Sequence, residues 1–288
     1  MCIRDRTREQ TSMVKIVPVD NPSDPRIAGF RDLNHAEKRR DHEGPDGVVI
    51  GEGSFVIDRM LDSYCPPTQF LGTDVGLDRL IAMPDYARIA NNTVFYKASA
   101  DVISECVGFH FNRHIFALAP RPTPRSVSDV LSHEPRTLVA LEGLNDHANI
   151  GSIFRNAAAL NVGGVLIGAG CADPLYRRSV RVSMGHVLRV PFAVCEGGPN
   201  DWQEQTFEQL HAAGYRILAL TPAHDAQFLS NAADGDKVAF LVGAEGPGLR
   251  RKTMRLADAR VQIPMQLGVD SLNVATSAAV AFYERIRN

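Results

Sequence analysis

From Thr137 to the end of the chain, short apolar runs alternate with helical patterns. The apolar runs predict strands at Thr137–Leu141, Val162–Ile167, Arg189–Val194, Tyr215–Leu220, Val238–Val242 and Ala259–Ile263. The helical patterns predict helices at about Ile150–Leu160, Leu175–Val182, Trp202–Ala213, Arg250–Leu256 and Leu272–Ile286. Such alternation is typical of a mostly parallel sheet covered by helices on both faces. We therefore expect an α/β fold for this part of the chain.

Three segments of this part each join an apolar run, a turn rich in Gly, Asn or Pro, and a helical pattern. They are Leu138–Leu160, Lys237–Leu249 and Val261–Glu284. Polar residues without an evident packing role occupy the turns. Because ligands of α/β sheets bind where strands end and helices begin, these turns predict a functional site.

The N-terminal part predicts a smaller α/β unit. Helical patterns cover Ile27–Arg39 and Gly53–Tyr64, and short strands are expected near Val48–Ile50, Gln69–Gly72, Val94–Tyr96 and His114–Leu118. Three prolines between Ala119 and Ser126 interrupt any helix or central strand. We therefore expect a non-native or disordered tail at residues 1–12, a small α/β unit at 13–120, a linker at 121–136, and the main domain at 137–288.

The composition is that of an ordinary soluble protein, with 44% hydrophobic and 22% charged residues among 288. No apolar stretch is long enough to span a bilayer. Five scattered cysteines without a CxxC pair fit a reducing cytoplasm. The net charge is −2, but two basic clusters flank the turns and predict either solvated faces or nucleic-acid contacts. Their members are Arg177, Arg178 and Arg181, and Arg250, Arg251, Lys252 and Arg255.

Two other patterns are set aside. Val165–Asp173 approaches a dinucleotide fingerprint, but the third glycine is missing and Asp173-Pro174 follows where a helix should begin. Cys106, His110 and His114 have helical spacing, but they lack a fourth ligand. We expect neither a nicotinamide site nor a metal site.

The first segment places Asn149, Gly151 and Arg155 at the start of a helix. Asn149 is either a helix N-cap or a functional amide. Arg155 follows it by about one and two-thirds turns, so both can face the same region above the sheet. An arginine this early opposes the helix dipole, and its guanidinium suits the binding of a phosphate.

The second segment predicts a tight loop at Gly243–Gly248, where the backbone can approach a ligand closely. Glu245 within it either binds a ligand or accepts hydrogen bonds from the loop's own amides, and we favour the amides. In the third segment, Pro264 ends the strand. Ser271 is either a helix N-cap or a site residue, and the small residues that follow Asn273 imply close packing.

The strings DHANIGSIFRNAA, LVGAEGPGL and IPMQLGVDSLNVATSAA resemble, in this order and spacing, the three motifs of the SpoU/TrmH family of RNA methyltransferases in the SPOUT superfamily. The resemblance covers Thr137–Arg287. The N-terminal part more loosely resembles the ribosomal-protein-like substrate-binding domain of many members. His147 stands where the family often has proline, and His114 where that domain usually has glycine.

The resemblance implies a SPOUT-type, mostly parallel sheet with a deep C-terminal trefoil knot that holds S-adenosylmethionine. By motif, Gly243, Ile263 and Leu272 would contact this cofactor, with Leu220, Met265 and Gly248 beside them. It also implies a homodimer whose site is completed near the subunit interface.

The implied reaction is methyl transfer to a ribose 2′-hydroxyl of tRNA or rRNA, with no DNA or membrane partner. Because arginine is very hard to deprotonate, we expect Arg155 to clamp the hydroxyl while an RNA phosphate takes the proton. Asn149, Ser271 and Asn273 would orient Arg155 and the ribose, and Glu245 would brace the loop. The alternative is a non-catalytic RNA-binding protein that retains the fold.

Overall fold

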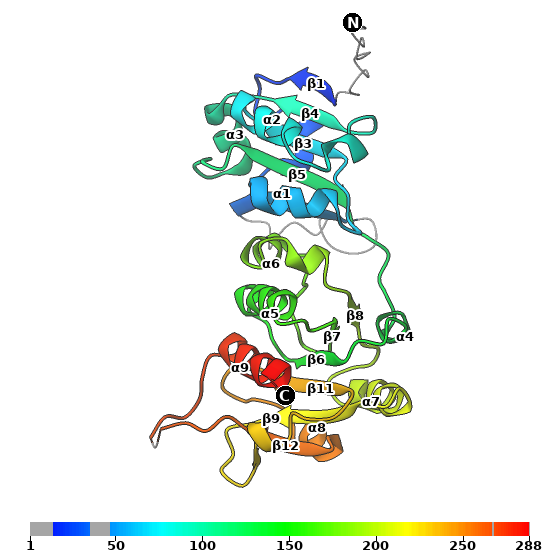
Figure 1. Cartoon of the computed structure of the whole chain (residues 1–288). Coiled ribbons are helices and arrows are strands. Elements are labelled where there is room, and N and C mark those ends of the chain that lie inside the picture. Colours follow the sequence, from blue (N-terminus) through cyan, green and yellow to red (C-terminus); the bar gives the residue numbers. More distant parts are fainter. Residues whose placement is uncertain (1–13, 35–46, 267, 288) are drawn as a thin grey trace, which may run out of the picture. The chain divides into compact units, whose positions relative to one another are not determined.

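A computed structural model of the chain describes residues 14–34, 47–266 and 268–287 (Figure 1). The chain divides into two compact units, Met1–Pro122 and Thr123–Asn288. The tail expected at residues 1–12 lies outside the described residues. Every helix within the described ranges is too short or too polar to cross a membrane.

The first unit is built on a five-stranded sheet with the order β1-β4-β3-β5-β2. The strands are β1 (Lys15–Pro18), β2 (Val48–Glu52), β3 (Gln69–Gly72), β4 (Val94–Lys97) and β5 (Ile115–Pro120). Strands β1, β4 and β3 run parallel, whereas β5 pairs antiparallel with β3 and β2. The sequence predicted β2 to β5 and missed β1.

Three α-helices of the first unit are α1 (Ser54–Leu61), α2 (Asp74–Ile81) and α3 (Ala100–Val107). Helix α1 confirms the pattern at Gly53–Tyr64, while α2 and α3 were not predicted. The helix predicted at Ile27–Arg39 is wrong over its described part, which forms a 3-10 helix at Pro25–Phe30. Asp32 then has a φ of 53°, a left-handed conformation that no helix can include. Residues 35–39 of that prediction lie outside the described residues.

His114, before β5, occupies a conformation that favours glycine. Its φ is 67°, in the left-handed region. Its carbonyl also lies against Gly76 of α2, where an added Cβ would come within 2.1 Å of the oxygen. The geometry therefore explains why a glycine suits the position that His114 holds here.

The second unit contains a seven-stranded sheet with the order β10-β12-β9-β11-β6-β7-β8, and all its neighbouring strands run parallel. The strands are β6 (Thr137–Glu142), β7 (Gly164–Ile167), β8 (Phe192–Val194), β9 (Arg216–Leu220), β10 (Gln227–Phe228), β11 (Val238–Gly243) and β12 (Ala259–Gln262). The helices are α4 (Val127–Leu131), α5 (His147–Ala159), α6 (Arg177–Val182), α7 (Trp202–Ala212), α8 (Arg251–Leu256) and α9 (Val274–Arg287). The mostly parallel α/β sheet predicted from the sequence is thus confirmed. The knot implied by the family resemblance stays a prediction.

The linker expected at residues 121–136 contains a helix that belongs to the second unit. Ser126 and Asp129 form a capping box at the start of α4. Val127 and Val130 then pack into the hydrophobic core beside Trp202. The prolines end before Ser126, so the polar stretch after them is free to form this helix.

Apolar cores cover both faces of the sheet in the second unit. On β11, Phe240 lies 6.2 Å from the ring of Phe282 in α9, whereas Leu241 joins the core around Trp202 of α7. Both residues are fully buried. Because the faces of β11 are filled, its carboxyl end is the part left to contact a ligand.

Candidate functional site

The carboxyl ends of three neighbouring strands, β12, β9 and β11, border a cavity of about 450 Å³. All six residues that the sequence predicted beside the cofactor line it: Leu220, Gly243, Gly248, Ile263, Met265 and Leu272. Glu245, Ser271 and Asn273 line it too, whereas Asn149 and Arg155 do not. Strand ends beside the point where the strand order reverses are where open α/β sheets bind ligands.

The loop after β11 folds back on itself, as its glycines predicted. Gly248 N donates a hydrogen bond to Ala244 O at 2.9 Å, and the two residues form an isolated antiparallel bridge. An added Cβ on Gly243 would lie 2.2 Å from Leu249 N, so this position admits no side chain while the loop keeps this conformation. Gly246 has a φ of 82°. The loop therefore needs glycine for both space and conformation.

Asn273 connects the turns of the first, second and third segments. Its Oδ1 accepts hydrogen bonds from Ala275 N at 2.9 Å and Thr276 N at 3.3 Å, which caps α9. Its Nδ2 donates to Asn149 Oδ1 at 3.0 Å and to Glu245 Oε1 at 2.9 Å. One side chain therefore fixes a helix start and holds two other predicted site residues.

This arrangement corrects the N-cap reading of Ser271 and the role favoured for Glu245. Asn273, and not Ser271, caps α9. Among the described hydrogen bonds, the Glu245 carboxylate accepts from Asn273 and not from amides of its own loop. The loop closes instead through the backbone bond between Gly248 and Ala244.

Asn149 is also not an N-cap. Helix α5 begins at His147, and Asp146 caps it by accepting a hydrogen bond from Ala148 N at 2.9 Å. Asn149 lies within the first turn and is 9% exposed. Its amide is thus buried against Asn273, and helix capping does not account for its identity.

Arg155 lies on α5 with an exposed side chain. It makes no hydrogen bond or ion pair with any residue that the structure describes. The neighbouring Asn156 instead donates from Nδ2 to Ala275 O at 2.9 Å, which ties α5 to α9. The structure therefore places Arg155 outside the hydrogen-bonded group of Asn149, Glu245 and Asn273, with its guanidinium available to an external anion.

Gly151 allows α6 to approach α5. A Cβ on Gly151 would lie 2.7 Å from Ser179 O and 2.9 Å from Val182 Cβ. Ser179 Oγ also donates to His147 O at 3.1 Å, and the His147 ring lies 4.2 Å from that of Tyr176. The glycine of the first motif is thus a packing requirement.

One of the two patterns set aside in the sequence, the glycine pattern at Val165–Asp173, has a structural explanation. Gly168 follows β7, where a Cβ would lie 2.8 Å from the indole of Trp202 and 2.6 Å from Leu141 O. Its small size therefore serves core packing. Within the described part of the chain, His, Cys, Asp and Glu form no cluster of three or more that could hold a metal ion.

The basic clusters are partly engaged in the fold. Arg250 Nη1 donates to Pro199 O and to Asn200 Oδ1, each at 3.2 Å. Lys252 Nζ contacts Glu204 Oε1 at 2.6 Å. Part of the second cluster therefore holds the loop before α7, so its charges are not all directed at a partner.

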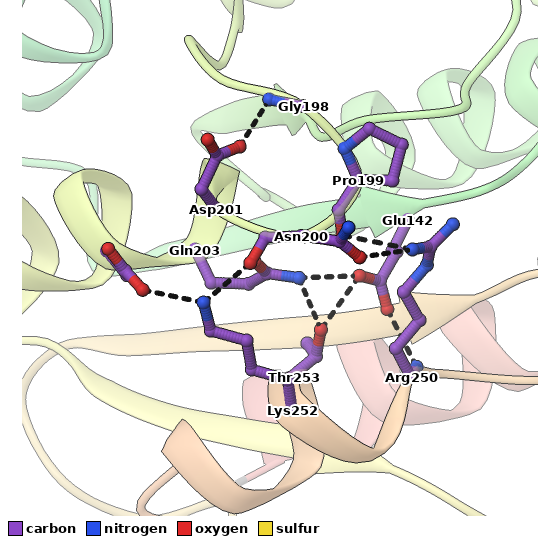
Figure 2. A network of polar contacts seen from close by, with 10 residues as sticks. Glu142, Gly198, Pro199, Asn200, Asp201, Gln203, Arg250, Lys252 and Thr253 are labelled. Carbon is purple, nitrogen blue, oxygen red and sulfur yellow. Dashed lines mark hydrogen bonds and ion pairs between the residues drawn. The ribbon is translucent and has the colours of Figure 1, made fainter.

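The sequence reasoning missed Glu142, the last residue of β6, which is almost fully buried. Figure 2 shows its carboxylate hydrogen bonded to Gln203, Thr253 and Arg250. A charged residue at the end of an otherwise apolar strand was the available signal. Thr221, Pro222 and Asp270 also line the cavity and were not predicted. No feature of their local sequence distinguishes them from ordinary turn residues.

Comparisons with known proteins agree with the motifs. Residues 136–283 match the SpoU rRNA Methylase family. An uncharacterized tRNA/rRNA methyltransferase of Mycobacterium bovis is 46% identical over 286 residues, covering 98% of this chain and 96% of that protein.

Two solved structures share the fold. An AdoMet-bound rRNA methyltransferase from Sinorhizobium meliloti has a TM-score of 0.73 at 22% identity, covering 94% of this chain and 98% of that one. An RNA 2′-O ribose methyltransferase has a TM-score of 0.70 at 25% identity, with the same coverage of 94% and 98%. The family resemblance predicted from the motifs is thereby confirmed, and the chain belongs to the SpoU rRNA methylase family.

Proposed function

We propose that this protein transfers the methyl group of S-adenosylmethionine to a ribose 2′-hydroxyl of tRNA or rRNA. The observation that carries the proposal is the cavity at the ends of β9, β11 and β12, where every residue predicted beside the cofactor lies. Asn273, on its border, is hydrogen bonded to Asn149 and Glu245, two further residues of the motifs. Family membership and the 2′-O ribose methyltransferase with the same fold support the same reaction.

The chemistry of the cavity fits this cofactor. Its volume of about 450 Å³ is in the range of small-molecule sites. Leu220, Ile263 and Leu272 give it apolar walls suited to an adenine ring. Asp270 adds a carboxylate that can accept hydrogen bonds from the polar groups of the cofactor. When bound, the cofactor's sulfonium supplies the electrophilic methyl group, so the protein's task is to position the acceptor.

Arg155 acts in this proposal as a clamp on RNA. Its guanidinium is exposed and makes no hydrogen bond or ion pair with the described residues. It binds the phosphate next to the target nucleotide and presents the 2′-hydroxyl in line with the methyl group. The RNA phosphate takes the proton that the hydroxyl loses. Asn149, Ser271 and Asn273 orient the ribose of the target nucleotide, and Glu245 braces Asn273.

The protein would work as a homodimer in the cytoplasm. Helix α9 leaves Tyr283 59% and Ile286 53% exposed, and apolar side chains of this kind suit a subunit interface. Among the described residues, Cys65, Cys106 and Cys195 are buried and take part in no disulfide, which fits a reducing compartment. RNA, and not DNA, is the expected nucleic-acid partner. Its phosphates would make binding weaken as salt rises.

The test is transfer of tritium-labelled methyl groups from S-adenosylmethionine to purified tRNA and to rRNA, with wild-type protein and Arg155→Ala. We expect labelling of one RNA class by the wild type, and a loss of about a hundredfold in the variant. RNA binding without transfer, together with no cofactor binding by calorimetry, would instead identify a non-catalytic RNA-binding protein. Mapping the methylated nucleotide in a deletion strain then identifies the target.

A further inference from the structure

Glu142 is a buried carboxylate at the carboxyl end of β6. Glu142 is 2% exposed, and it pairs in register with Gly243, the last residue of β11. Burying a charged group is costly unless hydrogen bonds replace the lost water. Strand pairing alone therefore does not explain why a glutamate is buried at this position.

Four donors surround the Glu142 carboxylate, and Figure 2 draws three of them, Gln203, Arg250 and Thr253. Oε1 accepts from three side chains at 2.7–3.1 Å. They are Trp202 and Gln203 of α7 and Thr253 of α8. Oε2 accepts from the backbone N–H of Arg250 at 2.9 Å. The two oxygens thus have separate roles, because Oε1 joins α7 to α8 and Oε2 holds the backbone N–H of Arg250.

The backbone bond of Oε2 closes the loop that borders the cavity. Gly243 opens this loop and pairs with Glu142 through the β ladder. Arg250 ends it and donates its N–H to the Glu142 side chain. Between them, Ala244, Glu245, Gly246 and Gly248 line the cavity. A single residue therefore holds both ends of the loop, through its backbone at one end and its carboxylate at the other.

The outer side of the same turn is held by a second set of contacts (Figure 2). The Arg250 side chain donates to Pro199 O at 3.2 Å, and Lys252 Nζ donates to Asn200 O at 2.5 Å. These contacts join the turn to the segment before α7. They leave the backbone N–H of Arg250 to Glu142.

We infer that Glu142 is a positioning residue for the cofactor: its Oε2 fixes the Gly243–Arg250 loop in the conformation that binds S-adenosylmethionine. The inference rests on the proposed function for the identity of the ligand. Glu142 does not line the cavity and does not touch the reacting atoms. Its loss should therefore weaken cofactor binding and leave the methyl-transfer step nearly unchanged.

Glu142→Gln separates the two roles. The amide oxygen can keep the three side-chain donors, and the amide nitrogen then faces Arg250 N, so that a donor meets a donor. The control is Thr253→Val, which changes the volume little and leaves the Arg250 contact intact. It removes the bond to Oε1 and the bond that Thr253 Oγ1 accepts from Gln203 Nε2. Both variants lose a buried hydrogen bond, so both should unfold at lower temperature. Only Glu142→Gln should free the loop.

Three measurements on the full chain test this. In calorimetry, Glu142→Gln should raise the Kd for S-adenosylmethionine about tenfold, as expected for a bond to a charged group. Thr253→Val should keep the Kd within about twofold of wild type. In methyl transfer, Glu142→Gln should raise the KM for the cofactor about tenfold and leave kcat within about twofold of the wild-type value. Amide exchange at residues 243–250 should accelerate in Glu142→Gln alone.

A wild-type Kd in Glu142→Gln, or an equal rise in Thr253→Val, would overturn the inference. If the wild type itself binds no S-adenosylmethionine, the proposed function fails, and amide exchange still decides whether Glu142 holds the loop. Should Glu142→Gln fail to fold, Arg250→Pro and Arg250→Ala test the same bond. The Arg250 φ of −65° suits proline, which removes the N–H, whereas alanine keeps it.

Discussion

Asn273 Nδ2 lies 3.0 Å from Asn149 Oδ1, although 124 positions separate the two residues in the chain. The contact joins the first turn of α5 to the first turn of α9. Asn273 also caps α9 and donates to Glu245, so its amide oxygen and amide nitrogen have different roles. Substitutions that remove one role and keep the other can therefore separate folding from function.

Asn273→Asp should keep the α9 cap and abolish activity. The aspartate retains an acceptor for the N–H groups of Ala275 and Thr276 but places an oxygen against Asn149 Oδ1 and Glu245 Oε1. We expect methyl transfer to fall about a hundredfold, because the groups that orient the ribose are displaced. Asn273→Ala should lose as much activity and also about 1 kcal/mol of stability with the cap. Wild-type turnover by Asn273→Asp would show that Asn273 is only a cap.

Gly243→Ala should abolish cofactor binding while the protein stays folded. The new Cβ would lie 2.2 Å from Leu249 N and 2.3 Å from Gly248 C, so the loop must open. Gly198→Ala is the matched control, because its Cβ would meet only Asp201 Oδ1 at 3.5 Å. Calorimetry with S-adenosylmethionine should give no measurable binding for Gly243→Ala and a wild-type Kd for the control. Equal affinities of the two variants would exclude the loop from the cofactor site.

Gly151→Ala should destabilise the second unit. Its Cβ would lie 2.7 Å from Ser179 O and 3.1 Å from Ser183 N, both backbone atoms of the α6 region. Overpacking of this kind costs about 1–3 kcal/mol, which thermal unfolding can measure. Ser152→Ala on the same helix should unfold at the wild-type temperature. A wild-type unfolding temperature for Gly151→Ala would show that α5 and α6 do not pack this closely.

The buried thiols should be unreactive in the native protein. Burial raises the pKa of Cys65 to about 12 and that of Cys195 to about 11. Iodoacetamide at pH 8 should therefore modify them only after denaturation, since the thiolate is the reactive form. The unfolding free energy should also fall as pH rises above about 9, because the unfolded chain's thiols lose protons that the native ones keep. Rapid labelling of Cys65 or Cys195 in the native protein at pH 8 would contradict this burial.

The sequence could predict where the site lies but not which residues cap its helices. Strands and glycine-rich turns in the second unit follow from apolar runs and from the steric demands at Gly243 and Gly246. The start of α5 was misplaced because Asp146 and Asn149 are both good N-caps; Asp146 caps the helix, and the Asn149 amide binds Asn273 instead. Ser271 and Asn273 present the same ambiguity.

Tertiary contacts also explain the larger omissions. Glu142 gains its side-chain donors from α7 and α8, which lie 60 to 111 positions further along the chain. Helix α4 has a local signal in Ser126 and Asp129, but the preceding prolines favoured a linker. Strand β10 has only two residues, too few for a periodic pattern to stand out.

The most direct test of the account is the chemical position of the transferred methyl group. RNA labelled by the purified protein with tritiated S-adenosylmethionine is digested to nucleosides and separated by chromatography. We predict that the label elutes with a single 2′-O-methylnucleoside and that Arg155→Ala, with an unchanged cofactor Kd, yields about a hundredfold less. Label on a base, or full labelling by Arg155→Ala, would contradict ribose methylation with Arg155 as the clamp.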